Sequence, residues 1–145
     1  MPEVPALPGS LIEQVAAVFA DGGALSSALQ GFEPREGQRR MAVAAAEVLS
    51  ENGTLLVEAG TGTGKTLAYL IPALLSGRRV LISTGTKTLQ EQILSKDIPA
   101  VSTVLGRPVS ATVMKGRSNY VCLHRLENAK ATTCLLYTSD AADEL

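Results

Sequence analysis

Residues Thr54–Thr66, with the sequence TLLVEAGTGTGKT, decide the predicted fold. An apolar, β-type segment at 54–58 runs into a glycine-rich loop that ends in Gly64-Lys65-Thr66. A strand, a loop whose backbone N–H groups converge and a helix N-terminus, in this order, are typical of a phosphate-binding loop. Glycines at 60, 62 and 64 let the backbone approach phosphate oxygens without an intervening Cβ. The alternative is a glycine-rich turn that binds nothing; the pattern favours a loop that binds a nucleoside triphosphate.

Two side chains at the end of this loop are predicted to act on the triphosphate. Lys65 would reach the β- and γ-phosphates as a point charge, and the Thr66 hydroxyl would ligate Mg²⁺. The strict phosphate-loop pattern requires glycine at the first position, where this chain has Ala59, so only a looser form of the pattern fits. The predicted triphosphate-binding residues are Ala59, Gly60, Thr61, Gly62, Thr63, Gly64, Lys65 and Thr66.

Composition predicts a folded chain of one domain at most, because the chain has 145 residues of which 46% are hydrophobic. A net charge of −1 neither supports nor excludes nucleic-acid binding. Two cysteines give no disulfide framework, and the acidic N-terminus is unlike a signal peptide. The longest apolar run, Leu67–Leu75, is too short to span a membrane. We therefore expect a soluble, cytoplasmic protein with no membrane partner.

Helical patterns flank the loop on both sides. Ser10 and Glu13 form the sequence pattern of a capping box at the start of the first helix. Pro72 is expected to kink or shorten the helix in which it lies, and Pro99 to break the one before it. Helices are predicted over 10–20, 25–29, 34–49, 64–75 and 87–94, with a further piece that ends at Leu105.

Three short segments have the pattern of strands: Thr54–Glu58, Arg79–Thr84 and Ala111–Met114. They alternate with the predicted helices, and such alternation indicates a parallel α/β sheet with right-handed crossovers. The final segment, CLLYTSDAADEL at 134–145, does not continue this alternation. It resembles the in-frame translation of a sequencing adapter, so the authentic protein is predicted to stop near Thr133. A genuine acidic C-terminal tail is the alternative.

Polar segments lie on either side of the loop. In Phe32–Gln38, FEPREGQ, the glutamine amide matches the N6 and N7 edge of adenine, and an aromatic ring can stack on the base. In Ser83–Gln92, STGTKTLQEQ, small hydroxyls and one lysine suit a phosphodiester backbone. Taken alone, each signal is weak, because a single glutamine or a cluster of threonines is more often structural than functional.

Four segments together resemble a known family: FEPREGQRRMA, VEAGTGTGKTLAYL, ISTGTKTLQEQ and KGRSNYVCLHRLE. The first three are similar to the Q motif, motif I and motif Ia of superfamily 2 helicases. All four look like the DinG/YoaA branch of the XPD-type iron–sulfur DNA helicases, over about 29–127. The resemblance implies a partial RecA-like P-loop NTPase domain of the α/β class, with short N-terminal helices. It also implies ATP and Mg²⁺ as ligands, 5′–3′ DNA unwinding and a role in DNA repair.

The resemblance assigns roles to residues outside the loop. Phe32, Arg35 and Gln38 would join the loop in binding ATP, with Gln38 reading the adenine. Cys122 matches the first of four cysteines that hold a [4Fe–4S] cluster in the intact protein, whereas composition alone would make it a small buried hydrophobe. Cys134 falls in the adapter-like tail and is not counted as a ligand. The implied contacts to single-stranded DNA are Thr84, Thr86, Lys87 and Gln90.

The predicted organisation has N-terminal lead-in helices at 1–28, the first part of a helicase ATP-binding domain at 29–133, and the tail at 134–145. Neither a Walker B strand nor a second motor domain is recognisable. The main hypothesis is an N-terminal piece of a monomeric, ATP-dependent DNA helicase that acts on single-stranded and forked DNA. The alternatives are a nucleotide-binding fragment without turnover, and a P-loop ATPase or kinase that is not a helicase.

Overall fold

The computed structural model describes residues 9–131. The chain divides into two compact units, one up to Val113 and one from Met114. This division does not test the predicted domain boundaries at 28/29 and 133/134, which stay predictions. The adapter-like tail at 134–145 lies outside the described residues.

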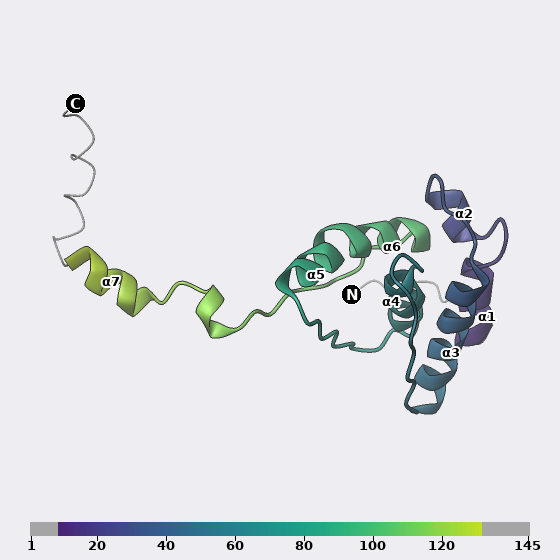
Figure 1. Ribbon diagram of the computed structural model, residues 1–145, viewed down its shortest axis with the longest axis horizontal. Helices are drawn as coiled ribbons and strands as arrows, with labels where there is room; N and C mark the ends of the chain where they lie inside the picture. Colours follow the sequence, from purple (N-terminus) through teal and green to yellow (C-terminus); the bar gives the residue numbers. More distant parts are fainter. Residues whose placement is uncertain (1–8, 132–145) are drawn as a thin grey trace. The chain divides into compact units, whose positions relative to one another are not determined.

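The first unit is helical where its structure is regular. Three helices precede the glycine-rich loop in the sequence, a fourth begins directly after it, and a longer helical run follows (Figure 1). The helices are α1 (Leu11–Val18), α2 (Ala24–Ala28), α3 (Glu36–Glu51), α4 (Lys65–Leu75), α5 (Lys87–Gln92), the π-helical turn η1 (Ile93–Asp97) and α6 (Ile98–Leu105).

Local capping signals set the ends of two of these helices, and the capping box of the first was predicted. The Ser10 hydroxyl accepts a hydrogen bond from the Glu13 backbone N–H at 3.2 Å. In return, the Glu13 carboxylate accepts one from the Ser10 N–H at 2.8 Å, which completes the capping box of α1. The helix α3 ends at its C-terminus where Asn52 takes the left-handed conformation, with φ 57°.

The structure tests the effects predicted for the two prolines, except for a kink at Pro72, which stays a prediction. Pro72 lies inside α4, which still runs to Leu75, so the proline does not shorten the helix. Pro99 does not break its helix either, because α5, η1 and α6 follow one another without interruption. Pro99 lies in the first turn of α6, directly after the π turn η1, and the wider π turn changes the spacing of the carbonyls that precede the proline. The predicted break at Pro99 is therefore wrong.

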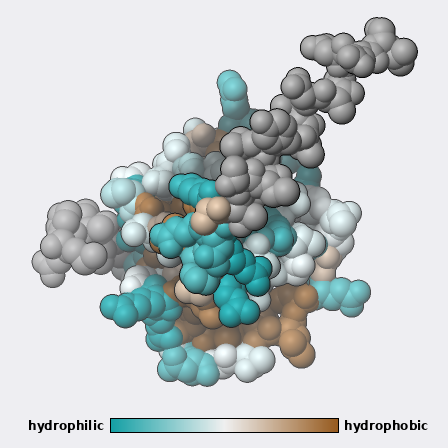
Figure 2. Space-filling model, turned by 90° about the vertical axis from the view of Figure 1, so that its left-hand side faces the viewer, coloured by the Kyte–Doolittle hydropathy of each residue, from teal (hydrophilic) through white to brown (hydrophobic). Residues whose placement is uncertain are grey.

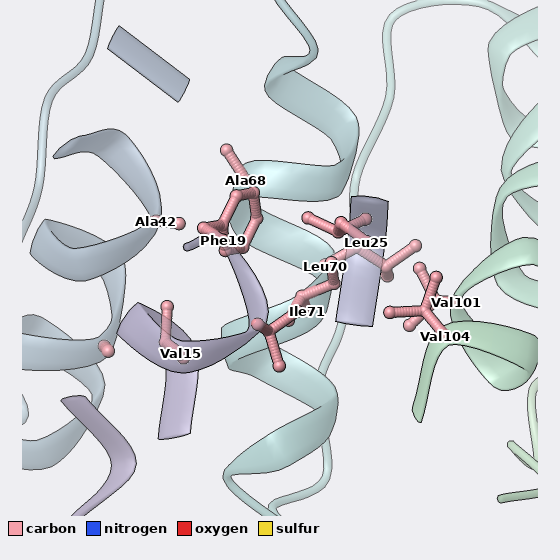
Figure 3. Packing of buried hydrophobic residues seen from close by; sticks show 11 residues of the cluster. Val15, Phe19, Leu25, Ala42, Ala68, Leu70, Ile71, Val101 and Val104 are labelled. Atoms are coloured by element: carbon pink, nitrogen blue, oxygen red, sulfur yellow. The ribbon is translucent and has the colours of Figure 1, made fainter. Parts of the chain in front are cut away.

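The core of the first unit lies where α4 meets the helices around it. Ala68, Leu70 and Ile71 of α4 are buried. They pack in one cluster with Val15 and Phe19 from the α1 region, Leu25 of α2, Ala42 of α3, and Val101 and Val104 of α6 (Figure 3). Since α4 carries Lys65 and Thr66 in its first turn, this packing anchors the end of the phosphate loop.

The predicted parallel α/β sheet is wrong for this structure, because no residue between 9 and 131 is in a strand. Segments 54–58, 79–84 and 111–114 have no regular secondary structure. Ile82 is partly buried against the core, but most of the other apolar side chains that a sheet would bury face solvent. Leu56 is 93% exposed, Leu81 95% and Met114 85%. A segment becomes a strand only when a neighbouring strand accepts and donates its backbone hydrogen bonds, and in the part of the chain that the structure describes none of these segments has such a neighbour.

The second unit contains the 3₁₀ turn η2 (Arg117–Asn119) and the helix α7 (Leu123–Ala131). Its apolar side chains are also exposed, among them Tyr120, Val121 and Leu123. Figure 2 shows hydrophobic residues, in brown, on the face of the molecule that it views. In the stretch 9–131, every helix is too short or too polar to cross a membrane.

Candidate nucleotide site

The candidate site is the loop at 59–64 together with the first turn of α4. Gly62 and Gly64 adopt positive φ angles of 74° and 78°, which other residues reach only with strain. Gly64 is the residue directly before α4, and its carbonyl accepts the first hydrogen bond of that helix, from the Ala68 N–H at 3.2 Å. The loop therefore leads directly into the N-terminus of an 11-residue helix, where unpaired N–H groups and the helix dipole favour an anion.

Lys65 is the first residue of α4, and its side chain contacts the backbone of the preceding loop. Its ammonium group donates hydrogen bonds to the carbonyl oxygen of Ala59, at 2.6 Å, and to that of Gly60. The Gly60 carbonyl also accepts a hydrogen bond from the Thr63 hydroxyl at 3.0 Å. A positive charge thus sits beside the loop backbone, where a phosphate group could exchange with the neutral carbonyls as its partner.

The Thr66 hydroxyl lies near that of Tyr69, three residues further along α4. The two hydroxyl groups are close enough for Thr66 to influence the pKa of Tyr69, and Tyr69 is partly buried against the core. Burial raises the pKa of the Tyr69 phenol, the hydrogen bond with Thr66 lowers it, and the nearby charge of Asp97 raises it, so the net shift is upward. Tyr69 was not among the predicted site residues. The spacing of three residues on one helix is the signal that could have found it.

The residues around the start of α3 contact the loop. Arg35 donates a hydrogen bond from Nη1 to the carbonyl oxygen of Gly62. Gln38 is 4% exposed, and its Nε2 donates to the carbonyl oxygen of Gly64 at 3.0 Å. Phe32, in contrast, packs against the hydrophobic core as a partly buried side chain. The structure thus brings Arg35 and Gln38 to the loop, as the sequence suggested, and gives Phe32 a packing contact.

A hollow of about 600 Å³ lies between α3 and residues 57–63. Gln38, Met41, Gly60 and Thr63 are among the residues that line it. Its size is within the usual range for small-molecule sites. Since neither Lys65 nor Thr66 lines this hollow, we do not assign it to the triphosphate.

The predicted DNA contacts lie around the start of α5. Thr86 is exposed, and its hydroxyl oxygen caps that helix by accepting a hydrogen bond from the Leu89 N–H at 3.2 Å. The Thr84 hydroxyl donates to the Thr86 carbonyl at 3.1 Å. Lys87, the first residue of α5, is exposed, whereas Gln90 is half-buried. Thr84 and Thr86 therefore have a structural role at this turn, and a contact with DNA stays a prediction for all four residues.

Cys122 is exposed, so the interpretation of this residue as a small buried hydrophobe is wrong. A [4Fe–4S] cluster needs four thiolates. Within residues 9–131, Cys122 is the one cysteine, and no group of three or more His, Cys, Asp or Glu side chains is arranged as a metal site. The described residues therefore do not fit the cluster, and we derive no chemistry from it. For Mg²⁺, they offer the Thr66 hydroxyl as a ligand of suitable chemistry.

Comparison with known proteins places this loop among helicases. The model of the family described as DEAD/DEAH box helicase matches residues 38–144. "ATP-dependent DNA helicase YoaA" of Escherichia coli is 54% identical over 109 residues, which are 75% of this chain and 17% of that protein. The protein of the same name from Haemophilus influenzae is 45% identical over 118 residues, 81% of this chain and 18% of its own length.

A third relative carries a different description. "3'-5' exonuclease DinG" of Bacillus subtilis is 43% identical over 108 residues, 72% of this chain and 12% of that protein. The chain thus spans less than a fifth of the length of these three curated relatives. No solved structure was found to match the chain.

Proposed function

The chain belongs to the DEAD/DEAH box helicase family, and from that premise we propose that residues 59–66 bind ATP for a DNA helicase. The observation that carries the proposal is the loop itself. Two glycines in the left-handed region, at 62 and 64, turn the backbone into the first turn of α4, which presents Lys65 and Thr66. When bound, Mg²⁺ would neutralise phosphate charge, and the Thr66 hydroxyl would be one of its ligands.

For the whole protein we propose ATP-dependent 5′–3′ unwinding of DNA, with single-stranded and forked DNA as substrates. The names of the Escherichia coli and Haemophilus influenzae relatives support helicase activity. The polarity, the [4Fe–4S] cluster with Cys122 as a ligand, the monomeric state and the role in repair rest on the family resemblance. The exonuclease activity named for the Bacillus subtilis relative is not extended to this chain, because the shared residues carry a phosphate loop and are 12% of that protein.

The direct test is nucleotide binding by the chain itself. Isothermal titration with ATP and Mg²⁺ would compare the unsubstituted chain with Lys65→Ala, which removes the charge next to the loop. A charge-assisted contact of this kind changes affinity by about tenfold or more. The matched control is Lys96→Ala, which removes an exposed lysine from η1. Equal affinity of Lys65→Ala and the unsubstituted chain would rule out the proposed site.

The DNA contacts are tested separately by titrating a fluorescent single-stranded oligonucleotide. Lys87→Ala is expected to weaken binding and to lower the salt dependence of the affinity, because one phosphate contact would be lost. The same Lys96→Ala variant serves as the control, since that lysine is exposed in the neighbouring turn. Loss of binding by both variants to the same extent would show a general charge effect in place of a specific contact.

A further inference from the structure

Asn52, directly after α3, has an unusual backbone conformation. Among residues 9–131 it is the one residue other than glycine with a positive φ, 57°, and Gly53 follows it. Both residues are exposed. Asparagine tolerates this left-handed conformation, which is frequent where helices end. Helix termination thus accounts for the backbone, and a further role of Asn52 has to come from the groups around its side chain.

Two hydrogen bonds hold this pair of residues. Arg78 donates from Nη1 to Oδ1 of Asn52 at 2.7 Å. The Gly53 N–H donates to the Val48 carbonyl oxygen at 3.1 Å, and the same oxygen also accepts the Asn52 N–H. If the Gly53 N–H turns to solvent, the Val48 carbonyl therefore keeps a partner, and the exposed N–H binds water. Release of the Gly53 nitrogen from the helix end costs little.

We propose that Asn52 is a site of spontaneous deamidation and that Arg78 slows the reaction by holding the side chain. The Gly53 nitrogen loses its proton to hydroxide and attacks the carboxamide carbon of Asn52. The new N–Cγ bond forms, the Cγ–Nδ2 bond breaks, and the leaving nitrogen takes a proton from water, so ammonia departs and hydroxide is regenerated. Water then opens the cyclic imide at either carbonyl, which gives aspartate or isoaspartate.

Gly53 makes this ring closure sterically accessible. A glycine has no side chain beside the attacking nitrogen, and its backbone reaches conformations that other residues avoid. The other two asparagines, Asn119 and Asn128, are also exposed, but they precede tyrosine and alanine. They lack the feature that favours the reaction and therefore serve as internal references.

Either product would change the junction between α3 and segment 54–58. Aspartate at position 52 would place a negative charge at the C-terminus of α3, where the helix dipole disfavours it. It would also turn the contact with Arg78 into a charge-assisted hydrogen bond. Isoaspartate would add a methylene group to the backbone directly before the segment that leads to the loop at 59–64.

The test is incubation of the full chain in neutral and in mildly alkaline buffer, followed by peptide mapping with mass spectrometry. We expect the peptide with Asn52 to gain the mass that replaces NH₂ by OH about tenfold faster than the peptides with Asn119 and Asn128, and faster at the higher pH. Asp21-Gly22 could form isoaspartate without a change of mass. Isoaspartate is therefore assigned on the separated peptide that contains residue 52.

Two variants test the parts of the proposal. Gly53→Ala should slow the conversion about tenfold. A Cβ at 53 would lie 3.7 Å from a Val48 methyl group, an ordinary contact, so the variant keeps its fold. Arg78→Ala should speed the conversion about 2- to 10-fold, because one hydrogen bond no longer has to open. Arg79→Ala, at the next exposed position, is the matched control and should convert at the rate of the unsubstituted chain.

Conversion of Asn52 no faster than that of the other two asparagines would overturn the proposal, as would an unchanged rate in Gly53→Ala. Equal rates for Arg78→Ala and Arg79→Ala would refute the protective role of Arg78. Circular dichroism checks that each variant keeps its helices, and both arginines are exposed, so their replacement leaves the core untouched. The measurement needs no nucleotide, and its result is independent of the proposed ATP site.

Discussion

Tyr69 lies three residues after Thr66 on α4, so the two hydroxyl groups meet on one face of the helix. Burial raises the pKa of the phenol more than the hydrogen bond with Thr66 lowers it. The folded state therefore retains the Tyr69 proton at pH values where the unfolded chain, with a tyrosine pKa of about 10, has begun to lose it. Stability from this group is fully present below about pH 10 and is lost as the pH rises through the folded pKa.

This linkage predicts the effect of Tyr69→Phe. The variant lacks the ionisable group, so its free energy of unfolding should fall less between pH 8 and pH 11 than that of the unsubstituted chain. At neutral pH, where the phenol of the unsubstituted chain is protonated, the two proteins should differ much less in stability than at pH 11. Urea unfolding followed by circular dichroism at several pH values measures both effects. Parallel pH profiles of the two proteins would contradict the raised pKa.

At the residue scale, the sequence predicts what is local. The positive φ angles at Gly62 and Gly64 and the position of Lys65 at the start of a helix follow from a short pattern, and the structure has them. The contact of Gln38 with Gly64 joins residues 26 positions apart, and no local pattern encodes it. The glutamine was predicted to lie at the site, but its partner in the structure is the loop backbone.

At the scale of single elements, α1 shows how a few residues specify a helix. Ser10 and Glu13 close both hydrogen bonds of its capping box, and Val15, buried one turn later, packs in the core. The sequence predicts this helix because the signal lies within four residues. The prediction from sequence fails at Pro99. A π turn at 93–97 precedes the proline in one continuous helical run, and no short sequence pattern marks that turn.

The capping box predicts a measurable cost for Ser10→Ala. The variant leaves the Glu13 N–H without its side-chain acceptor and should lower the free energy of unfolding by about 1 kcal/mol. Ser10→Asp should recover most of that loss, because a carboxylate also caps a helix N-terminus. Ser110→Ala, at an exposed position outside any helix, is the matched control. A urea midpoint for Ser10→Ala equal to that of Ser110→Ala would contradict the prediction.

At the scale of the whole molecule, the sequence predicts the helices and the structure lacks the sheet. Helices close their hydrogen bonds within a segment, so their prediction needs only local sequence. A sheet depends on pairing between distant segments, and 54–58 and 79–84 have no strand beside them in the described part of the chain. The apolar character of Leu56 and Leu81 was recognised correctly, but their burial was not, since both are almost fully exposed.

Exposed apolar segments with unpaired backbone groups predict self-association. The double variant Leu56→Lys with Leu81→Lys should reduce concentration-dependent association without lowering the helical content, because neither side chain packs in the core. Sedimentation velocity over a range of concentrations measures this. Thr112→Lys is the control, since it adds a charge at an exposed position and removes no large apolar group. If the control reduces association as much as the double variant, net charge and not the apolar segments is responsible.

The same unpaired segments determine how the chain would respond to deuterated water. The backbone amides of 54–58 and 79–84 lack partners in a sheet and should take up deuterium at the rate of an open peptide, whereas α4, between them, should exchange slowly. The loop at 59–64 stands at the border between the fast and the slow stretch. A nucleotide that engages its N–H groups would slow exchange from Lys65 back toward Gly60, so protection of these few amides would report occupancy of the site residue by residue.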